Sequence, residues 1–159
     1  MSDQMMSKGN TISGMWEKAQ TFPMGKSIFS FMVGRAARYT GTIGARVESL
    51  ETGRGVVTMK DRASVRNHLK SVHAIALMNL GEFATGVTVM YQVDGRGRGI
   101  LKHIGMDYLK KSRGTITATC EAVVPTEPGK HDLKVDGVLT DESGDIVAKV
   151  HATWRIDIN

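Results

Sequence analysis

The 159-residue sequence is poor in cysteine, proline and aromatic residues. Cys120 is its one cysteine, so an intrachain disulfide is excluded and nothing indicates an oxidising compartment. The first residues contain scattered methionines but no continuous apolar run typical of a signal peptide. No later stretch approaches the roughly 18 apolar residues that a membrane span needs. We therefore expect a cytoplasmic protein that does not bind a membrane.

The sequence also lacks the spacing patterns of metal and nucleic-acid sites. The five histidines show no His-Glu-x-x-His pattern and no cysteine pair assists them, so we expect no metal. The Gly-Arg segment 95–99 is short and has no interleaved aromatic residues, which favours a flexible connection over an RNA-binding segment. The formal charge of +5 suits an anionic ligand, and charge alone does not identify which one. We expect no nucleic-acid partner.

Length and a hydrophobic content of 41% indicate one domain with a sizeable core. We expect residues 1–10 to form a flexible N-terminus and residues 11–159 to form the domain. Within it, the apolar spacing predicts short helices at 12–20 and 26–38. These helices are expected to cap the domain or to line a pocket.

From residue 42 onward, the apolar period changes from helical to strand-like. Strands are predicted at 45–50 and 55–60 around a turn, and four more at 100–109, 115–124, 132–140 and 145–157. In the last strand, one face carries only apolar residues: Ile146, Ala148, Val150, Ala152, Trp154 and Ile156. One apolar and one solvated face indicate an antiparallel sheet that is covered on one side.

Between the second and third predicted strands, the pattern predicts an apolar helix from Ala74 to Val87. Leu77, Leu80 and Ala84 recur at helical spacing, and almost no polar face remains, so the helix should be buried. Wrapping the sheet around this helix gives an α+β architecture. Glu82 is the exception to the apolar pattern. A carboxylate there loses hydration unless it is paired, so it usually has a partner or a task, and burial should raise its pKa.

The start of this helix offers a second chemical group. Its first backbone N–H groups, near residues 71–74, lack intrahelical acceptors and can polarise a carbonyl oxygen. Together with a buried carboxylate, they indicate acyl-transfer chemistry. Ala74 and Glu82 are separated by about 12 Å of axial rise, too far to act on one carbonyl. We therefore expect the second group to come from an antiparallel helix of another subunit, in a two-fold dimer.

The order of Asn67, His73, Ala74 and Glu82 resembles the loop and central helix of hotdog-fold acyl-CoA thioesterases of the phenylacetate-pathway branch. That branch typically reads Asn, five residues, His-Gly, then Asp or Glu nine residues after the His, and here Ala74 replaces the Gly. Segment 108–114 is similar to the branch's Leu-Arg-Pro-Ala-Arg-Gly pattern, and segment 39–47 to uncharacterised thioesterase-like members. The likeness spans about residues 39–157. It implies a hotdog fold, an antiparallel sheet wrapped around one long central helix.

The resemblance also implies roles for these residues. Glu82 would be the general base or nucleophile, Asn67 would position the water or the carboxylate, and the Ala74 N–H would polarise the thioester carbonyl. His73 matches a motif residue that is usually structural around the turn. The implied activity is hydrolysis of an acyl-CoA thioester in a homodimer or homotetramer, with no cofactor beyond the coenzyme A of the substrate.

A basic group lies near the end of the third predicted strand, at Lys110, Lys111 and Arg113. We expect these residues, together with Arg98, to contact coenzyme A phosphates at the mouth of the pocket. The alternative is a solvated sheet edge whose charges discourage association between sheets. The sequence leaves this choice open.

Further alternatives concern the catalytic residues and the reaction. Glu82 could pair with Lys70 or Arg66 of a neighbouring chain, and Asn67 could be only a turn or cap residue. A non-catalytic acyl- or lipid-binding module would need the pocket without the buried base. Hotdog hydratases typically carry the pattern Asp, four residues, His, and none of the five histidines fits it. The early Asp-rich motif of the 4-hydroxybenzoyl-CoA thioesterase branch is also missing. The acyl group, and the choice between coenzyme A and acyl-carrier protein, stay undetermined.

Overall fold

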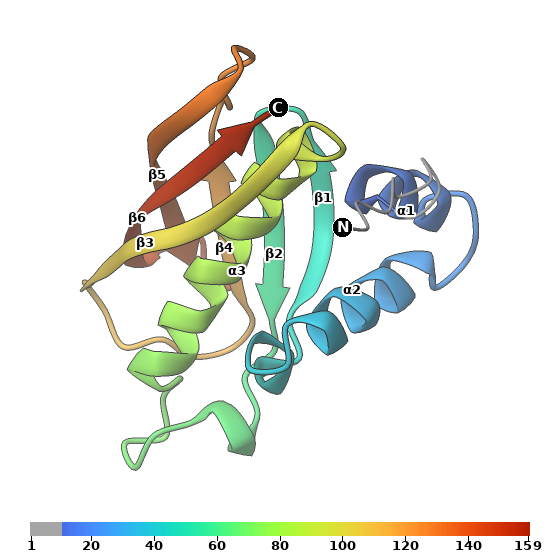
Figure 1. Cartoon of the computed structure of the whole chain (residues 1–159). Helices are drawn as coiled ribbons and strands as arrows, with labels where there is room; N and C mark the ends of the chain where they lie inside the picture. The colour runs from blue at the N-terminus through green and yellow to red at the C-terminus, as the bar shows by residue number, and fades with distance from the viewer. Residues whose placement is uncertain (1–10) are drawn as a thin grey trace.

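The computed structural model describes residues 11–159, so the expected flexibility of residues 1–10 lies outside the described part. Two helices precede the sheet, and a long helix separates its second and third strands (Figure 1). The elements are α1 (Ile12–Ala19), α2 (Gly25–Ala36), the 3₁₀ turn η1 (Thr40–Ile43), β1 (Arg46–Glu51), β2 (Arg54–Met59), the 3₁₀ turn η2 (Ala63–Val65), α3 (Ala74–Val93), β3 (Gly97–Tyr108), β4 (Ile116–Glu121), β5 (Gly129–Thr140) and β6 (Ile146–Ile158).

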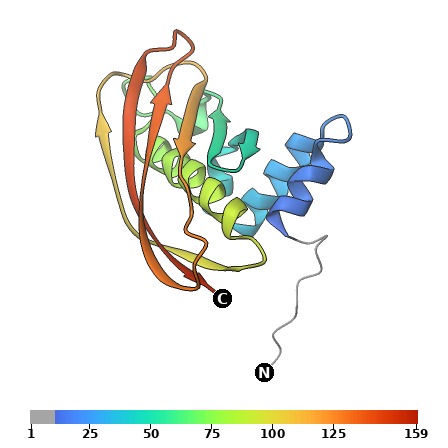
Figure 2. The same ribbon diagram turned by 90° about the horizontal axis from the view of Figure 1, so that it is seen from above.

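The six strands form one antiparallel sheet in the order β1-β2-β4-β5-β6-β3. Figure 2 shows the sheet curving around α3, with α1 and α2 on the side away from β5 and β6. The inward side chains of β4 and β6 are buried and the outward ones are more exposed, as one-sided cover requires. The predicted α+β hotdog architecture is confirmed.

The central helix is longer than the pattern predicted, because α3 continues to Val93. It approaches the sheet closely where it carries glycine: a Cβ on Gly81 would lie 2.9 Å from the Val150 side chain, and one on Gly86 would lie 3.0 Å from the Trp154 ring. The expectation that no stretch could span a membrane needs correction. By length and composition α3 is long and apolar enough to cross a membrane, although 61% of its apolar stretch is buried within the protein.

The predicted strands are present, with one error in the facing of the last one. Ala148 to Ile156 alternate as expected, but Ile146 is 43% exposed and Val147 is buried instead. A register shift between β5 and β6 at Leu139 and Thr140 changes the facing there. Such an irregularity is set by the pairing of two strands and has no signature in either strand alone.

The N-terminal helices are held to the domain by specific hydrogen bonds. Ser30 of α2 accepts a hydrogen bond from the backbone N–H of Val47 in β1 at 2.9 Å. Because β1 is an edge strand, α2 thereby covers one free edge of the sheet. In α1, both the N–H and the hydroxyl of Ser13 donate to Asp94 at the end of α3, at 2.7 and 2.6 Å. Helix α2 therefore forms one side of the space between β1 and α3.

Cys120 lies in β4 with no exposed surface. It pairs across the sheet with Gly55 and Gly137, two residues without side chains. Burial raises the pKa of the Cys120 thiol to about 11. The one cysteine is thus a packing residue, held in its unreactive protonated form.

Candidate active site

Glu82 lies in the middle of α3, where its carboxylate is partly buried beside η1. The Thr40 hydroxyl donates a long hydrogen bond to Glu82 Oε2, at 3.4 Å. Burial raises the pKa of Glu82 above the ordinary glutamate value, and the Thr40 hydrogen bond offsets part of that rise. Within residues 11–159, Glu82 takes part in no ion pair with Lys, Arg or His. The carboxylate is therefore partly desolvated, and no cation among residues 11–159 compensates its charge.

Asn79 is a second polar residue on the same side of α3, and it was not singled out from the sequence. It is 7% exposed, and its side-chain N–H donates to the backbone oxygen of Tyr39 at 3.2 Å. Asn79 and Glu82 are three residues apart, so both point toward the same neighbour on the helix surface. That neighbour is the segment around η1. The spacing of Asn79 and Glu82 was the available signal, whereas their partners Tyr39 and Thr40 depend on tertiary packing.

A groove of about 720 Å³ lies on the other side of η1, between α2 and the start of β1. Thr40, which contacts Glu82, and Phe83, which follows it, both line the groove. The groove is therefore adjacent to the carboxylate. The remaining lining residues are Ser27, Ser30, Phe31, Gly34, Arg35, Arg38, Gly41, Thr42, Gly44, Ala45 and Arg46.

Two glycines hold the walls of this groove together. A Cβ built on Gly41 would lie 2.4 Å from the backbone oxygen of Gly34, and one built on Gly34 would lie 3.2 Å from the Gly41 Cα. Backbone therefore packs directly on backbone where α2 meets η1, which only residues without a side chain permit. This contact fixes the position of Thr40, and through it the surroundings of Glu82.

Asn67 organises the loop before α3. Its side-chain oxygen accepts hydrogen bonds from the backbone N–H groups of Leu69 and Ser71, at 2.9 and 3.2 Å, and from the Ser71 hydroxyl at 3.2 Å. Lys70 at the tip of this loop has a positive φ of 55°. Asn67 is thus a turn-forming residue, one of the two alternatives left by the sequence. Its catalytic role stays a prediction.

At the start of α3, His73 is the N-cap, and its Nδ1 accepts a hydrogen bond from the Ile75 N–H at 3.0 Å. The Tyr108 hydroxyl donates to the backbone oxygen of Ala74 at 3.0 Å and fastens the helix start to the end of β3. Within the described residues, the Ala74 N–H donates to no acceptor. That it polarises a carbonyl oxygen stays a prediction.

A single chain does not bring all of these groups together. In the described part of the chain, no hydrogen bond links Glu82 with Asn67, His73 or Ala74. Glu82 is more than two helical turns beyond the start of α3. The completion of the site by a second subunit stays a prediction.

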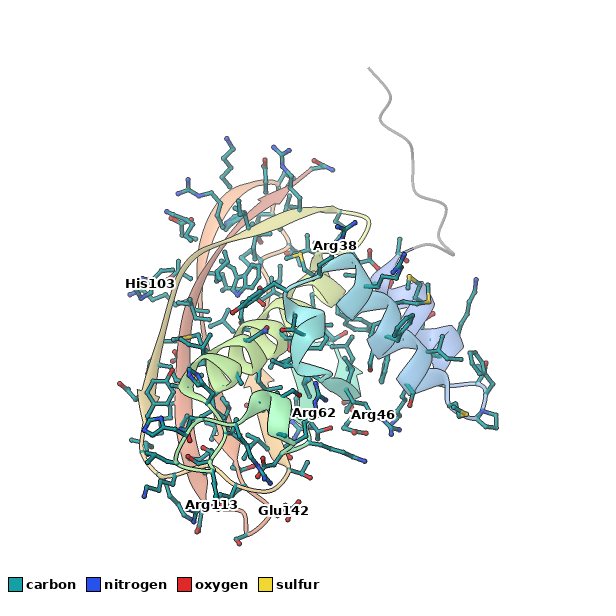
Figure 3. The ribbon with its side chains drawn as sticks, turned by 90° about the horizontal axis from the view of Figure 1, so that it is seen from below. Arg38, Arg46, Arg62, His103, Arg113 and Glu142 are labelled. Atoms are coloured by element: carbon teal, nitrogen blue, oxygen red, sulfur yellow. The ribbon has the colours of Figure 1, made fainter. Side chains whose placement is uncertain are left out.

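Lys110, Lys111 and Arg113 follow one another just after β3, but Arg98 lies at the far end of that strand, which corrects its grouping with Lys110. Arg98 lies inside β3 rather than in a loop. Lys110 follows the other end of β3, and the strand from Arg98 to Tyr108 spans about 33 Å at the usual rise. Arg98 pairs with Asp157 at 3.2 Å, and Lys110 pairs with two aspartates of the β5–β6 turn. Figure 3 shows Arg113 beside that turn, near Glu142.

The outer face of the sheet carries another group of charges, centred on His151. Its Nδ1 and Nε2 contact Asp136 and Asp107 at 2.8 and 3.1 Å, which links β6 to β5 and β3. The two carboxylates raise the pKa of His151. Among residues 11–159, no group of three or more His, Cys, Asp or Glu residues has an arrangement that could hold a metal ion. The expectation of no metal stays a prediction.

Comparison of the sequence with family models identifies the family. Residues 25–156 match the family described as "Domain of unknown function (DUF4442)", and the chain belongs to this family. The match includes α2, η1 and α3, and therefore both walls of the groove and Glu82. No curated protein matches the sequence.

Solved structures support the fold. A crystal structure described only as a genomics target is 28% identical, covers 93% of this chain and 99% of its own, and has a TM-score of 0.78. A protein of unknown function from Pseudomonas aeruginosa, described as a probable thioesterase, is 23% identical, with coverage of 87% and 97% and a TM-score of 0.72. A mutant thioesterase from Staphylococcus aureus is 17% identical, with coverage of 76% and 98% and a TM-score of 0.67. This chain therefore has a thioesterase-like hotdog fold.

Proposed function

We propose that this protein is a thioester hydrolase in which Glu82 activates a water molecule, or attacks directly, at the carbonyl of an acyl thioester. The observation that carries the proposal is the uncompensated carboxylate of Glu82 beside the groove. A buried carboxylate without a cation costs stability, which is understandable when the group serves a reaction. A raised pKa also makes Glu82 a better proton acceptor near working pH. The thioesterase-like fold supports the same reaction class.

In this proposal, the other groups come from the loop and helix start of a second subunit. The free N–H of Ala74 would polarise the thioester carbonyl, with His73 holding the first turn in place through its cap. Asn67 would position the water or the carboxylate through its side-chain N–H, since its oxygen is occupied by the loop. The homodimer or homotetramer then becomes a requirement for turnover. The proposed substrate is an acyl-CoA, with no added cofactor.

The test is thiol release from short, medium, long and aromatic acyl-CoA substrates by wild type and Glu82→Gln. We expect Glu82→Gln to lower kcat by about a hundredfold or more, because a general base contributes about that much. Glu121→Gln serves as the control, since the Glu121 side chain is 77% exposed on β4. Comparable turnover by Glu82→Gln and wild type would refute the assignment of Glu82.

The second candidate is a non-catalytic acyl-binding module. The apolar rings of Phe31 and Phe83 on the groove favour it, because a bound acyl chain needs such surface and no base. Equilibrium binding of the same acyl-CoA panel separates the two candidates. Tight binding without turnover by the wild type would select the module and reject the hydrolase.

A further inference from the structure

Arginines border the groove on both of its walls. Arg35 and Arg38 come from the end of α2 and the residues that follow it, and Arg46 is the first residue of β1. A fourth, Arg62, lies behind Gly44, where its guanidinium donates to the backbone oxygen of Thr42 at 3.1 Å. Figure 3 shows Arg38 near one end of α2, and Arg46 and Arg62 near each other close to the start of β1. Three arginines therefore line the groove, and a fourth lies next to it.

These positive charges are only weakly compensated. Within residues 11–159, Arg35 and Arg38 take part in no ion pair. Arg46 approaches Glu48 through its Nε at 3.5 Å, and Glu48 also accepts a hydrogen bond from Thr58 at 2.9 Å. Of the three lining arginines, only Arg46 contacts a carboxylate within the described residues. Such an excess favours an anionic ligand over an internal structural role.

The lining of α2 is suited to a ligand that is anionic and partly apolar. Ser27, Phe31 and Arg35 are spaced four residues apart and therefore follow one side of the helix. The Phe31 ring is 70% exposed at the groove, while Phe83 at the opposite wall is buried. A bound molecule would meet guanidinium groups near the end of α2 and the Thr40–Phe83 pair next to Glu82.

We propose that this groove binds the phosphate groups of the thiol carrier, with Arg35, Arg38 and Arg46 as the contacting residues. The proposal rests on the proposed function, because the position of Glu82 fixes which end of the substrate lies nearby. Arginine binds phosphate through paired N–H groups, and its charge persists at any physiological pH. The three groove arginines therefore replace Lys110 and Arg98 as the proposed phosphate contacts, because Lys110 and Arg98 already have carboxylate partners.

Two carriers supply this chemistry. Coenzyme A has a nucleotide with several phosphates, and the phosphopantetheine arm of a carrier protein has a single phosphodiester. In both, the phosphate is separated from the sulfur by the same uncharged pantetheine arm. An acyl-pantetheine therefore keeps the thioester and the arm but lacks the groups that the arginines would bind.

The experiment compares KM and kcat for acyl-CoA, acyl-phosphopantetheine and acyl-pantetheine with one acyl group. Arg35→Gln, Arg38→Gln and Arg46→Gln are tested singly, and Arg35→Gln with Arg38→Gln together. The matched control is Lys134→Gln, which removes one positive charge from the exposed face of β5. For acyl-CoA, we expect KM to rise about tenfold or more in the double variant, with kcat within twofold. KM for acyl-pantetheine should not change. An effect on acyl-phosphopantetheine as large as that on acyl-CoA assigns the groove to the arm's phosphate, and a smaller one assigns it to the nucleotide.

Binding of free coenzyme A by calorimetry keeps this proposal separate from the proposed function. If the wild type binds coenzyme A and the double variant loses about tenfold in affinity, the groove is a phosphate site even if no thioester is turned over. If turnover depends on Glu82 but the double variant handles all three substrates like the wild type, the groove assignment is wrong and the hydrolase stands. Equal changes in KM for acyl-CoA and acyl-pantetheine in the double variant would also overturn the groove assignment, since they would indicate altered packing.

Discussion

On the outer face of the sheet, several charged side chains pair across neighbouring strands, whereas Glu82, Arg35 and Arg38 around the groove take part in no ion pair within residues 11–159. Lys102 and Arg155 both contact Asp132 at 2.8 Å across β3, β5 and β6, and His151 bridges two further aspartates. On the groove side, in the described part of the chain, Glu82 has only a long hydrogen bond from Thr40. Neighbouring strands offer partners at every register position, so pairing is easily made there. Charges left without partners beside a cavity indicate a ligand.

The largest predicted effect is on the pH dependence of turnover. It tests whether the Glu82 carboxylate, unlike the paired carboxylates of the outer face, acts on a substrate. If Glu82 acts as the carboxylate, kcat/KM should fall about tenfold per pH unit below its pKa. Because burial raises the pKa of Glu82, the midpoint should lie above the ordinary value of 4.5. Thr40→Val removes a hydrogen bond that lowers this pKa and should move the midpoint higher, whereas Thr42→Val should not.

The measurement is the pH–rate profile of the wild type and both threonine variants, together with circular dichroism to establish that the protein stays folded over the range. A midpoint at or below 4.5 in the wild type would contradict a desolvated base. An equal shift in Thr40→Val and Thr42→Val would show that the hydrogen bond to Glu82 has no specific effect.

A smaller effect tests whether the groove depends on the backbone contact between α2 and η1. Gly41→Ala places a Cβ against the backbone oxygen of Gly34, which has no side chain that can move aside. We expect a loss of about 1–3 kcal/mol in the free energy of unfolding, the usual result of overpacking. Gly105→Ala in β3 is the control, because its nearest contact would be an ordinary 3.6 Å. Urea unfolding measures both, and equal losses would contradict the special role of Gly41.

The smallest effect is an opposite pH dependence of stability in the two regions. Burial raises the pKa of Glu82, so its charged form costs stability as the pH rises through that pKa, and Glu82→Gln should be more stable than wild type at pH 7. Arg155 and Lys102 hold the pKa of Asp132 far below 3.8, so its charged form stabilises the fold above that pH. Asp132→Asn should then be slightly less stable at pH 7.

Urea unfolding at several pH values between 3 and 8 measures this contrast. The Glu82 difference should shrink as the pH falls through its raised pKa toward 4.5, because protonation makes the side chain resemble the amide. The Asp132 difference should stay nearly constant down to its ordinary pKa of 3.8 and begin to shrink only below it, as the unfolded chain takes up the proton. Two variants that change stability in the same direction at pH 7 would abolish the distinction between a paired outer face and an unpaired groove.

The sequence predicted the helices and strands more completely than the contacts between them. The helix at Ala74 and the alternating strand ending at Ile156 follow from local periodicity, which one segment carries by itself. The exposure of Ile146 does not, since it arises from the register between two strands. The same holds for the strand position of Arg98, where a glycine-rich stretch continues a ladder with β6 instead of forming a loop.

The candidate site shows the same division. Glu82 stands out locally because a carboxylate interrupts an apolar helix, and Asn67 and His73 stand out through their resemblance to a motif. The arginines of the groove were not predicted. Arg35 and Arg38 lie near Arg46 only because α2 crosses the edge of β1, a long-range contact held by Ser30 and Val47.

The burial of Cys120 has a practical consequence for the study of this protein. Thiol release is usually followed with reagents that colour on reaction with a free thiolate, and a native protein whose one thiol is buried and protonated adds almost no background. The same burial makes the rate of Cys120 modification a measure of local opening of the core. Once the reagent is in excess, the rate at which Cys120 is modified reports how often the core opens, without any introduced label.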